Sequence, residues 1–162
     1  MSTVALEEFD RVMTGPNQID RKREDVQVTA ADLLAVPDGT ITEAGLRTNI
    51  SVSLQYMESW FRGSGCVPIN NLMEDAATVE ISRSQIWQWI RHPRGILADG
   101  RKVTVELFRQ MAAEELQKIK EMVGAQASAS RKFGEAAQLL DKIITSEQFV
   151  EFLTLPAYGY LE

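Results

Sequence analysis

The sequence predicts an all-α fold, a helical bundle of about five or six helices. Apolar residues recur at spacings of three and four along most of the chain, which is the period of an amphipathic helix. No segment alternates apolar and polar residues over the length of a strand. The expected helices are long and the connections between them are short, which favours antiparallel neighbours.

Size and composition are those of an ordinary globular domain, with 162 residues of which 44% are hydrophobic. A domain of this length buries enough surface to fold without disulfides. The single cysteine, Cys66, cannot form an intramolecular disulfide, which fits a reducing compartment. The sequence has no signal-peptide pattern and no apolar stretch of about 20 residues, so we expect a cytoplasmic protein without a membrane span.

The net charge of −6 argues against nucleic acid and anionic membranes as partners. The only dense basic run, residues 21–23, is flanked by Asp20, Glu24 and Asp25. We therefore interpret this run as part of a solvated linker and not as an anion site. One histidine and one cysteine are too few for a zinc site built from the usual ligands, and no metal site is predicted in this chain.

Residues 1–28 are expected to form an N-terminal helix and a linker, and residues 29–162 a separate all-α domain. An amphipathic stretch at residues 3–13 ends at a Gly-Pro-Asn sequence, which is typical of a helix break. Thr29 is a candidate N-cap for a short helix, and Pro37 is expected to help terminate it.

The clearest helix covers residues 43–61. Thr42 is its candidate N-cap, and Gly63 is the expected C-terminal stop. Its apolar stripe comprises Leu46, Ile50, Leu54, Met57 and Phe61. The opposite stripe is expected to be solvated, and it comprises Arg47, Ser51, Gln55, Glu58 and Arg62.

Two further long helices are expected after a compact loop at residues 63–72. The first begins at Glu74 and ends at Arg91, because His92 and Pro93 close it. The second covers residues 104–123.

The last part of the chain is expected to contain one more main helix, at residues 133–144. Small residues from 124 to 130 predict a break before this helix. Ser146 is a candidate cap for a final helical turn, and Pro156 is expected to end regular structure.

One continuous segment carries a resemblance to a known family. Residues 65–78 read Gly-Cys-Val-Pro-Ile-Asn-Asn-Leu-Met-Glu-Asp-Ala-Ala-Thr, and residues 85–90 read Gln-Ile-Trp-Gln-Trp-Ile. Both resemble the signature region of malate synthases of the shorter isoform class. Residues 42–47 and residues 152–158 also match that family. The similarity extends over nearly the whole chain but covers only the C-terminal part of the family's chain.

The resemblance implies the all-α C-terminal domain that caps a TIM barrel in the full-length enzyme, with residues 1–28 leading from the barrel. The family's enzymes are transferases of the glyoxylate cycle, next to the tricarboxylic acid cycle. They condense acetyl-CoA with glyoxylate and water to give malate and CoA. Their Mg²⁺ ligands and catalytic arginine lie in the barrel, so no position of this sequence is assigned to them.

The resemblance assigns the role of catalytic base to Asp75, the aspartate of the Met-Glu-Asp-Ala-Ala-Thr motif. A methyl proton of acetyl-CoA is very weakly acidic, so a base must lie within hydrogen-bonding reach of it. Fixed positive charge must stabilise the enolate that forms. From the residues alone, Asp75 is an N-cap at the start of a helix, and the two roles are compatible. Glu74 is expected to be an acid of the first helical turn.

Two residues are candidates for binding CoA. The resemblance implies that Cys66 lies near the thioester end of the CoA pocket. From its position in the adjoining loop, Pro68 is expected to line the pantetheine channel. From the residues alone, a lone cysteine such as Cys66 is expected to be a small buried hydrophobe.

Two functional hypotheses follow. The first is that the chain is part of a malate synthase that lacks activity alone, because the metal site and the catalytic arginine lie elsewhere. The alternative is a non-catalytic helical interaction module, derived from that enzyme, that binds a partner through the surface a barrel would otherwise cover.

Overall fold

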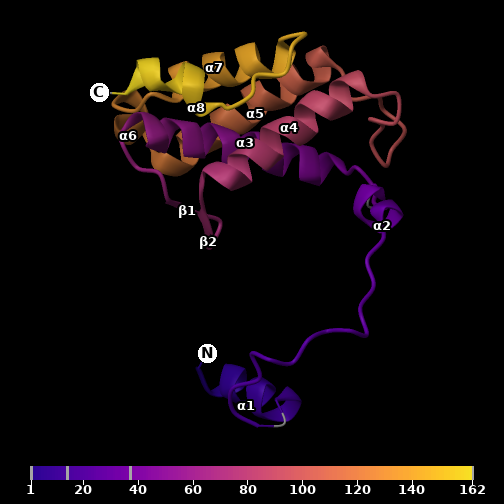
Figure 1. Cartoon of the computed structure of the whole chain (residues 1–162). Helices are drawn as coiled ribbons and strands as arrows, with labels where there is room; N and C mark the ends of the chain where they lie inside the picture. The colour runs from indigo at the N-terminus through magenta and orange to yellow at the C-terminus, as the bar shows by residue number, and fades with distance from the viewer. Residues whose placement is uncertain (1, 14, 37, 162) are drawn as a thin grey trace. The chain divides into compact units, whose positions relative to one another are not determined.

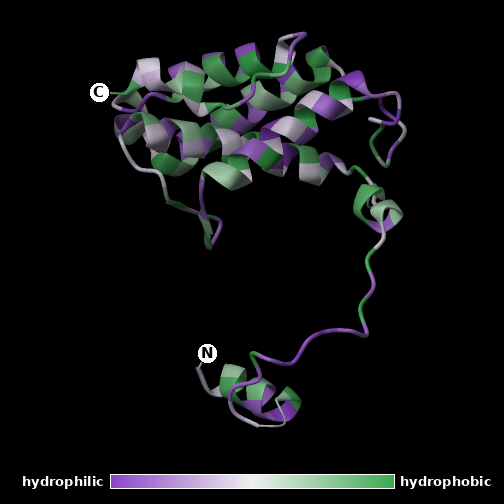
Figure 2. Ribbon diagram, in the orientation of Figure 1, coloured by the Kyte–Doolittle hydropathy of each residue, from purple (hydrophilic) through white to green (hydrophobic). Residues whose placement is uncertain are grey.

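The computed structural model describes residues 2–13, 15–36 and 38–161, and the chain divides into two units, residues 1–38 and residues 39–162. The first unit contains α1 (Ser2–Val12) and α2 (Ala30–Leu34), and neither helix buries a residue. Figure 2 shows hydrophobic and hydrophilic residues next to one another along α1.

Thr29 caps α2 as predicted. The Thr29 hydroxyl accepts a hydrogen bond from the N–H of Asp32 at 3.2 Å. The Asp32 carboxylate in turn accepts one from the Thr29 N–H at 2.8 Å, which completes a reciprocal capping box. Pro37, the expected terminator of this helix, lies outside the described residues.

The second unit is a helical bundle with one small hairpin (Figure 1). Its elements in chain order are α3 (Glu43–Phe61), β1 (Val67–Ile69), β2 (Leu72–Glu74), α4 (Ala76–Arg91), α5 (Val105–Val123), α6 (Ala125–Ala129), α7 (Phe133–Thr145), α8 (Thr154–Ala157) and a 3₁₀ turn at Tyr158–Tyr160. The all-α prediction is confirmed, and α1, α2, α3, α4, α5 and α7 correspond to the helices expected from periodicity.

Helix α3 lies at the centre of the bundle, because α4, α5 and α7 all pack against it. The Thr42 hydroxyl caps it by accepting a hydrogen bond from the N–H of Gly45 at 3.0 Å. Gly63, with a φ of 84°, follows its end in the left-handed conformation that favours glycine. The apolar stripe predicted for this helix is fully buried: Leu46, Ile50, Leu54, Met57 and Phe61 each expose 0%.

One residue of the stripe expected to be solvated is buried. Glu58 exposes only 1% of its surface. The Arg62 guanidinium donates two hydrogen bonds to its carboxylate, at 2.7 and 3.1 Å. A helix packed on several sides leaves little solvated surface, and paired charge makes the burial of Glu58 tolerable.

The predicted break at residues 124–130 is confirmed, since α5 ends at Val123 and α7 begins at Phe133, although alanine-rich residues within the break form the short helix α6. Two other sequence expectations in the last third of the fold are wrong. Pro156 lies within α8, in its first turn, where a missing N–H costs little. Ser146 caps no final helix; its carbonyl instead accepts a hydrogen bond from the Trp87 indole at 2.9 Å.

The sequence also failed to predict the hairpin, and the helix expected from Glu74 begins two residues later. Glu74 is the last residue of β2, and α4 starts at Ala76. In Figure 1 the hairpin formed by β1 and β2 projects from the helices of the second unit.

Candidate functional site

The three candidate site residues lie in or next to the hairpin that precedes α4. Pro68 is in β1, Cys66 directly precedes β1, and Asp75 directly follows β2. β1 and β2 pair antiparallel, with Val67 opposite Glu74, Pro68 opposite Met73 and Ile69 opposite Leu72. The two turn residues, Asn70 and Asn71, have φ values of 51° and 63°. Positive φ at both central residues is the geometry of a type I′ turn, the connection that best matches the twist of two paired strands.

Pro68 fits this hairpin without losing a hydrogen bond. In an antiparallel pair, hydrogen-bonded and non-hydrogen-bonded residue pairs alternate. Ile69 and Leu72 flank the two-residue turn and form the closing hydrogen-bonded pair, so the Pro68–Met73 pair is a non-hydrogen-bonded one. A proline is tolerated there because its missing N–H would have faced away from the partner strand.

Cys66 and Asp75 flank the hairpin at its open end. Cys66 directly precedes β1 and Asp75 directly follows β2, beyond the terminal pair of Val67 and Glu74. Asp75 has extended backbone angles, with φ of −127° and ψ of −175°, so the alternation of sides continues through it. Two residues distant in sequence thus flank the same hairpin.

Alternation divides the hairpin into two faces with different burial. We call one of them the exposed hairpin face, and it consists of Cys66, Pro68, Met73 and Asp75, all of which are exposed. The opposite face carries Ile69 and Glu74, which expose 3% and 8%, together with the half-buried Val67 and with Leu72, which lies beside the turn and exposes 63%. The candidate site residues therefore share one accessible surface, and Met73, which the sequence analysis did not single out, lies among them at 69% exposed.

Asp75 is the N-cap of α4. Its Oδ1 accepts a hydrogen bond from the Thr78 N–H at 3.2 Å and from the Thr78 hydroxyl at 3.5 Å. The positive end of the helix dipole favours a negative charge at this position. The carboxylate is therefore held in a defined orientation while it remains accessible from solvent.

Cys66 and Glu74 lie in environments opposite to those expected. Cys66 is exposed, because the alternation of the hairpin turns it to the solvent side. Glu74, expected in the first turn of a helix, is buried in β2 at 8% exposed. Both differences have one cause, which is the hairpin itself.

Tyr56 of α3 lies beneath the open end of the hairpin. It exposes 1% of its surface, and its hydroxyl donates a hydrogen bond to the Gly65 carbonyl at 3.0 Å. Burial raises the pKa of this phenol, and electrostatic interaction with Asp75 and Cys66 raises the pKa further. Sequence reasoning missed Tyr56, since nothing in the helical pattern distinguishes it from an ordinary core tyrosine.

Behind the site, a buried arginine fixes α4 to the segment that follows α7. Arg83 exposes 1%, pairs with the Glu80 carboxylate and donates a hydrogen bond to the Glu151 carbonyl at 3.1 Å. Glu80 also accepts a hydrogen bond from the Leu153 N–H at 2.7 Å. The helix that begins at Asp75 is thus firmly held.

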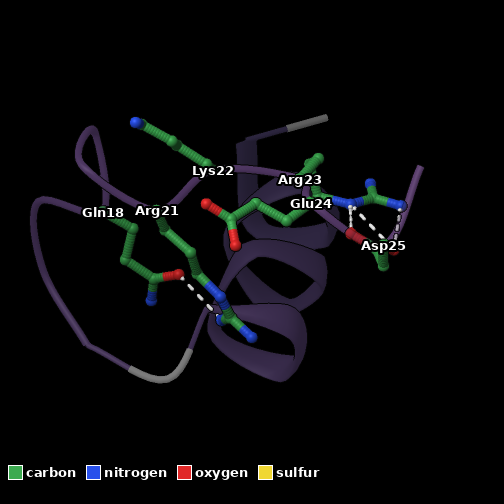
Figure 3. A pocket seen from close by; sticks show the side chains of 6 residues that line it. All are labelled: Gln18, Arg21, Lys22, Arg23, Glu24 and Asp25. Atoms are coloured by element: carbon green, nitrogen blue, oxygen red, sulfur yellow. Dashed lines mark hydrogen bonds and ion pairs between the residues drawn. The ribbon is translucent and has the colours of Figure 1, made fainter. Parts of the chain in front are cut away.

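Two open hollows among the described residues are lined by side chains that do not belong to the hairpin. The first, of about 620 Å³, is in the charged linker of the first unit and is shown in Figure 3. There Arg23 donates hydrogen bonds to both Asp25 oxygens, and Arg21 donates one to Gln18 at 3.3 Å. The second hollow, of about 740 Å³, is lined by Gln117, Lys120, Glu121, Ala125, Ser128, Ala129, Arg131, Phe133 and Gly134.

The described residues include no group of three or more His, Cys, Asp or Glu side chains that could hold a metal ion. None of the described helices is both long enough and apolar enough to cross a membrane.

Comparison with known proteins identifies the family of the second unit. Residues 40–161, which include the whole hairpin and α4, match the family model of the malate synthase C-terminal region. The chain belongs to this family. The helical fold is therefore that of a malate synthase C-terminal domain.

Individual malate synthases are similar over nearly the whole chain. The malate synthase of Myxococcus xanthus is 50% identical over 159 residues, which cover 98% of this chain and 29% of that protein. Malate synthase A of Escherichia coli is 46% identical, over 99% of this chain and 30% of that protein. The glyoxysomal malate synthase of Brassica napus is 41% identical, over 98% of this chain and 29% of that protein. The chain thus spans about three-tenths of the length of these relatives.

Proposed function

We propose that this chain is the C-terminal part of a malate synthase and that Asp75 is the base that removes a proton from the methyl group of acetyl-CoA. The observation that carries the proposal is the position of Asp75: an exposed, oriented carboxylate at the open end of the hairpin, where it caps α4. A general base must reach its substrate and must be held in place, and this arrangement meets both needs.

In the proposed reaction, the Asp75 carboxylate takes the methyl proton, and the electrons of the broken C–H bond form the enolate of the thioester. The enolate carbon then forms a bond to the aldehyde carbon of glyoxylate, and the π electrons of the aldehyde move to its oxygen, which takes up a proton. Water then cleaves the thioester C–S bond of the product, which gives malate and CoA. Cys66, Pro68 and Met73 would line the approach of the thioester and pantetheine to the carboxylate. Met73 and Pro68 are exposed apolar groups suited to that contact.

The remaining chemistry is assigned to residues outside this chain. The described residues do not fit a Mg²⁺ site. The resemblance to the family implies that residues of the barrel would hold Mg²⁺, which would polarise the aldehyde, and that an arginine of the barrel would stabilise the enolate. We therefore propose a TIM barrel as the partner of this domain, with residues 1–28 as the helix and linker that join the two.

A first assay separates the chain from the complete enzyme. The 162-residue chain alone, given acetyl-CoA, glyoxylate and Mg²⁺, should release no CoA. The same chain fused behind the part of Escherichia coli malate synthase A that precedes the matched region should turn over. Activity of the isolated chain would contradict the division of chemistry proposed above.

A second assay tests Asp75 in that fusion. Asp75→Asn should lower kcat by about 10²- to 10⁴-fold, the range expected for a general base. Asparagine caps helices about as well as aspartate, so the urea midpoint should not change. Asp99→Asn, which alters another exposed carboxylate, is the matched control and should leave kcat unchanged. Near-normal turnover of Asp75→Asn would remove Asp75 from the mechanism.

A second candidate function is a helical interaction module without chemistry. Exposed apolar residues around the hairpin and α4 favour it: Leu72, Met73 and Ile81 expose 63%, 69% and 60%. Light scattering and a CoA titration of the isolated chain discriminate the two. A monomer with measurable CoA affinity supports the enzyme, whereas stable self-association without CoA binding supports the module.

A further inference from the structure

We propose that Tyr56 is a positioning residue for the exposed hairpin face: by holding the Gly65 carbonyl it sets where Cys66 and Asp75 lie. Tyr56 does not touch substrate in this proposal. The inference rests on the proposed function, because its effect on turnover requires Asp75 to act as the base.

The contact is specific in its geometry. The Tyr56 side chain is buried within α3, and its hydroxyl reaches the Gly65 carbonyl at 3.0 Å. That carbonyl belongs to the planar peptide unit whose N–H is that of Cys66. A hydrogen bond to it therefore fixes the orientation of the chain at the point where it enters the hairpin.

The backbone hydrogen bonds that tie this loop to α3 end at Ser64, one residue before Gly65. Backbone hydrogen bonds to the end of α3 hold Gly63 and Ser64, at 2.8 and 3.1 Å. On the other strand, the capping bond to Thr78 holds Asp75. A two-stranded hairpin is marginally stable by itself, so its contacts with the bundle decide its position. Tyr56 supplies the contact on the Cys66 side.

The electrostatics agree with the geometry. Burial raises the pKa of Tyr56, and electrostatic interaction with Asp75 and Cys66 raises it further. The phenol therefore keeps its proton across the neutral range. The carbonyl of Gly65 can only accept, so the retained proton keeps the hydrogen bond intact.

The first test uses the 162-residue chain. Tyr56→Phe keeps the buried ring and removes only the hydroxyl. Amide hydrogen exchange at residues 66–75 should become about three- to tenfold faster, as expected for the loss of one hydrogen bond. The rate of alkylation of Cys66 should change by a similar factor. The matched control is Tyr160→Phe, whose ring stacks on Phe61 at 4.8 Å between centroids. It should leave hairpin exchange and Cys66 alkylation unchanged.

The second test measures kinetics in the fusion described above. Tyr56→Phe should lower kcat about tenfold while the KM for acetyl-CoA changes less than about twofold, because misplacement of a base affects the chemical step. Equal exchange, alkylation and kcat in Tyr56→Phe and Tyr160→Phe would overturn the inference. If instead Asp75→Asn retains turnover, the proposed function fails, while the exchange result still reports whether Tyr56 positions the hairpin.

Discussion

The first 36 residues and the bundle from residue 39 onward both contain helices with proper caps, yet only the bundle buries its apolar side chains. In the first region Val4, Phe9 and Leu33 expose 65%, 61% and 77%. In the bundle Leu46 and Leu54 expose 0%. Periodicity and capping chemistry therefore identify a helix in both regions, but burial depends on whether neighbouring elements are present to cover its apolar side.

The sharpest test of this contrast compares two large apolar side chains. Leu54→Ala should lower the free energy of unfolding by about 2–5 kcal/mol, because it removes buried contacts and leaves a cavity. Phe9→Ala should change it by less than about 0.5 kcal/mol, since Phe9 contributes to no core in this chain. Urea unfolding curves followed by circular dichroism measure both. A comparable loss in Phe9→Ala would mean that α1 is part of the cooperative unit.

Two threonine caps give a smaller and closer comparison. Thr42 and Thr29 each accept a capping hydrogen bond, at 3.0 and 3.2 Å. Thr42→Ala should cost about 1 kcal/mol of the free energy of unfolding, because α3 is the centre of the bundle. Thr29→Ala should leave the main transition unchanged and lower only the helicity of α2. Equal losses in the two variants would show that both regions unfold together.

Of these tests, lowering the pH should change the free energy of unfolding least, and the change should again come from the bundle. Hydrogen bonds from Arg47, and then from Arg101, hold the pKa of Glu43 below its usual value. A carboxylate with a lowered folded-state pKa stabilises the fold above its unfolded pKa, and this contribution is lost as pH falls through the folded pKa. The free energy of unfolding should therefore be flat near neutrality and decline below about pH 4.5.

Glu43→Gln should make that decline shallower. Asp25 provides the matched control, since Arg23 lowers the pKa of Asp25 by hydrogen bonding in the first unit. Asp25→Asn should not alter the acid profile of the bundle. An unchanged slope in Glu43→Gln would assign the acid sensitivity to other carboxylates.

The candidate site was predictable only in part. The motif around Asp75 and the N-cap chemistry of that residue are both legible in the sequence, and the cap is present in the structure. The Asn-Asn turn between two short apolar segments was a usable signal for the hairpin, and it was overlooked because three-residue strands show too little alternation. The role of Asp75 as base remains a prediction.

By itself, the sequence determined the helices, their Thr29 and Thr42 caps and the stop at Gly63, because these features depend on residues within a few positions of one another. Only the tertiary structure decided that Cys66 is exposed and that Glu58 is buried. It also decided that Cys66 and Asp75 flank one hairpin and that Tyr56 bonds the Gly65 carbonyl at its open end. Those outcomes depend on strand register and on the packing of α3 between its neighbours, which bring together residues that no local pattern connects.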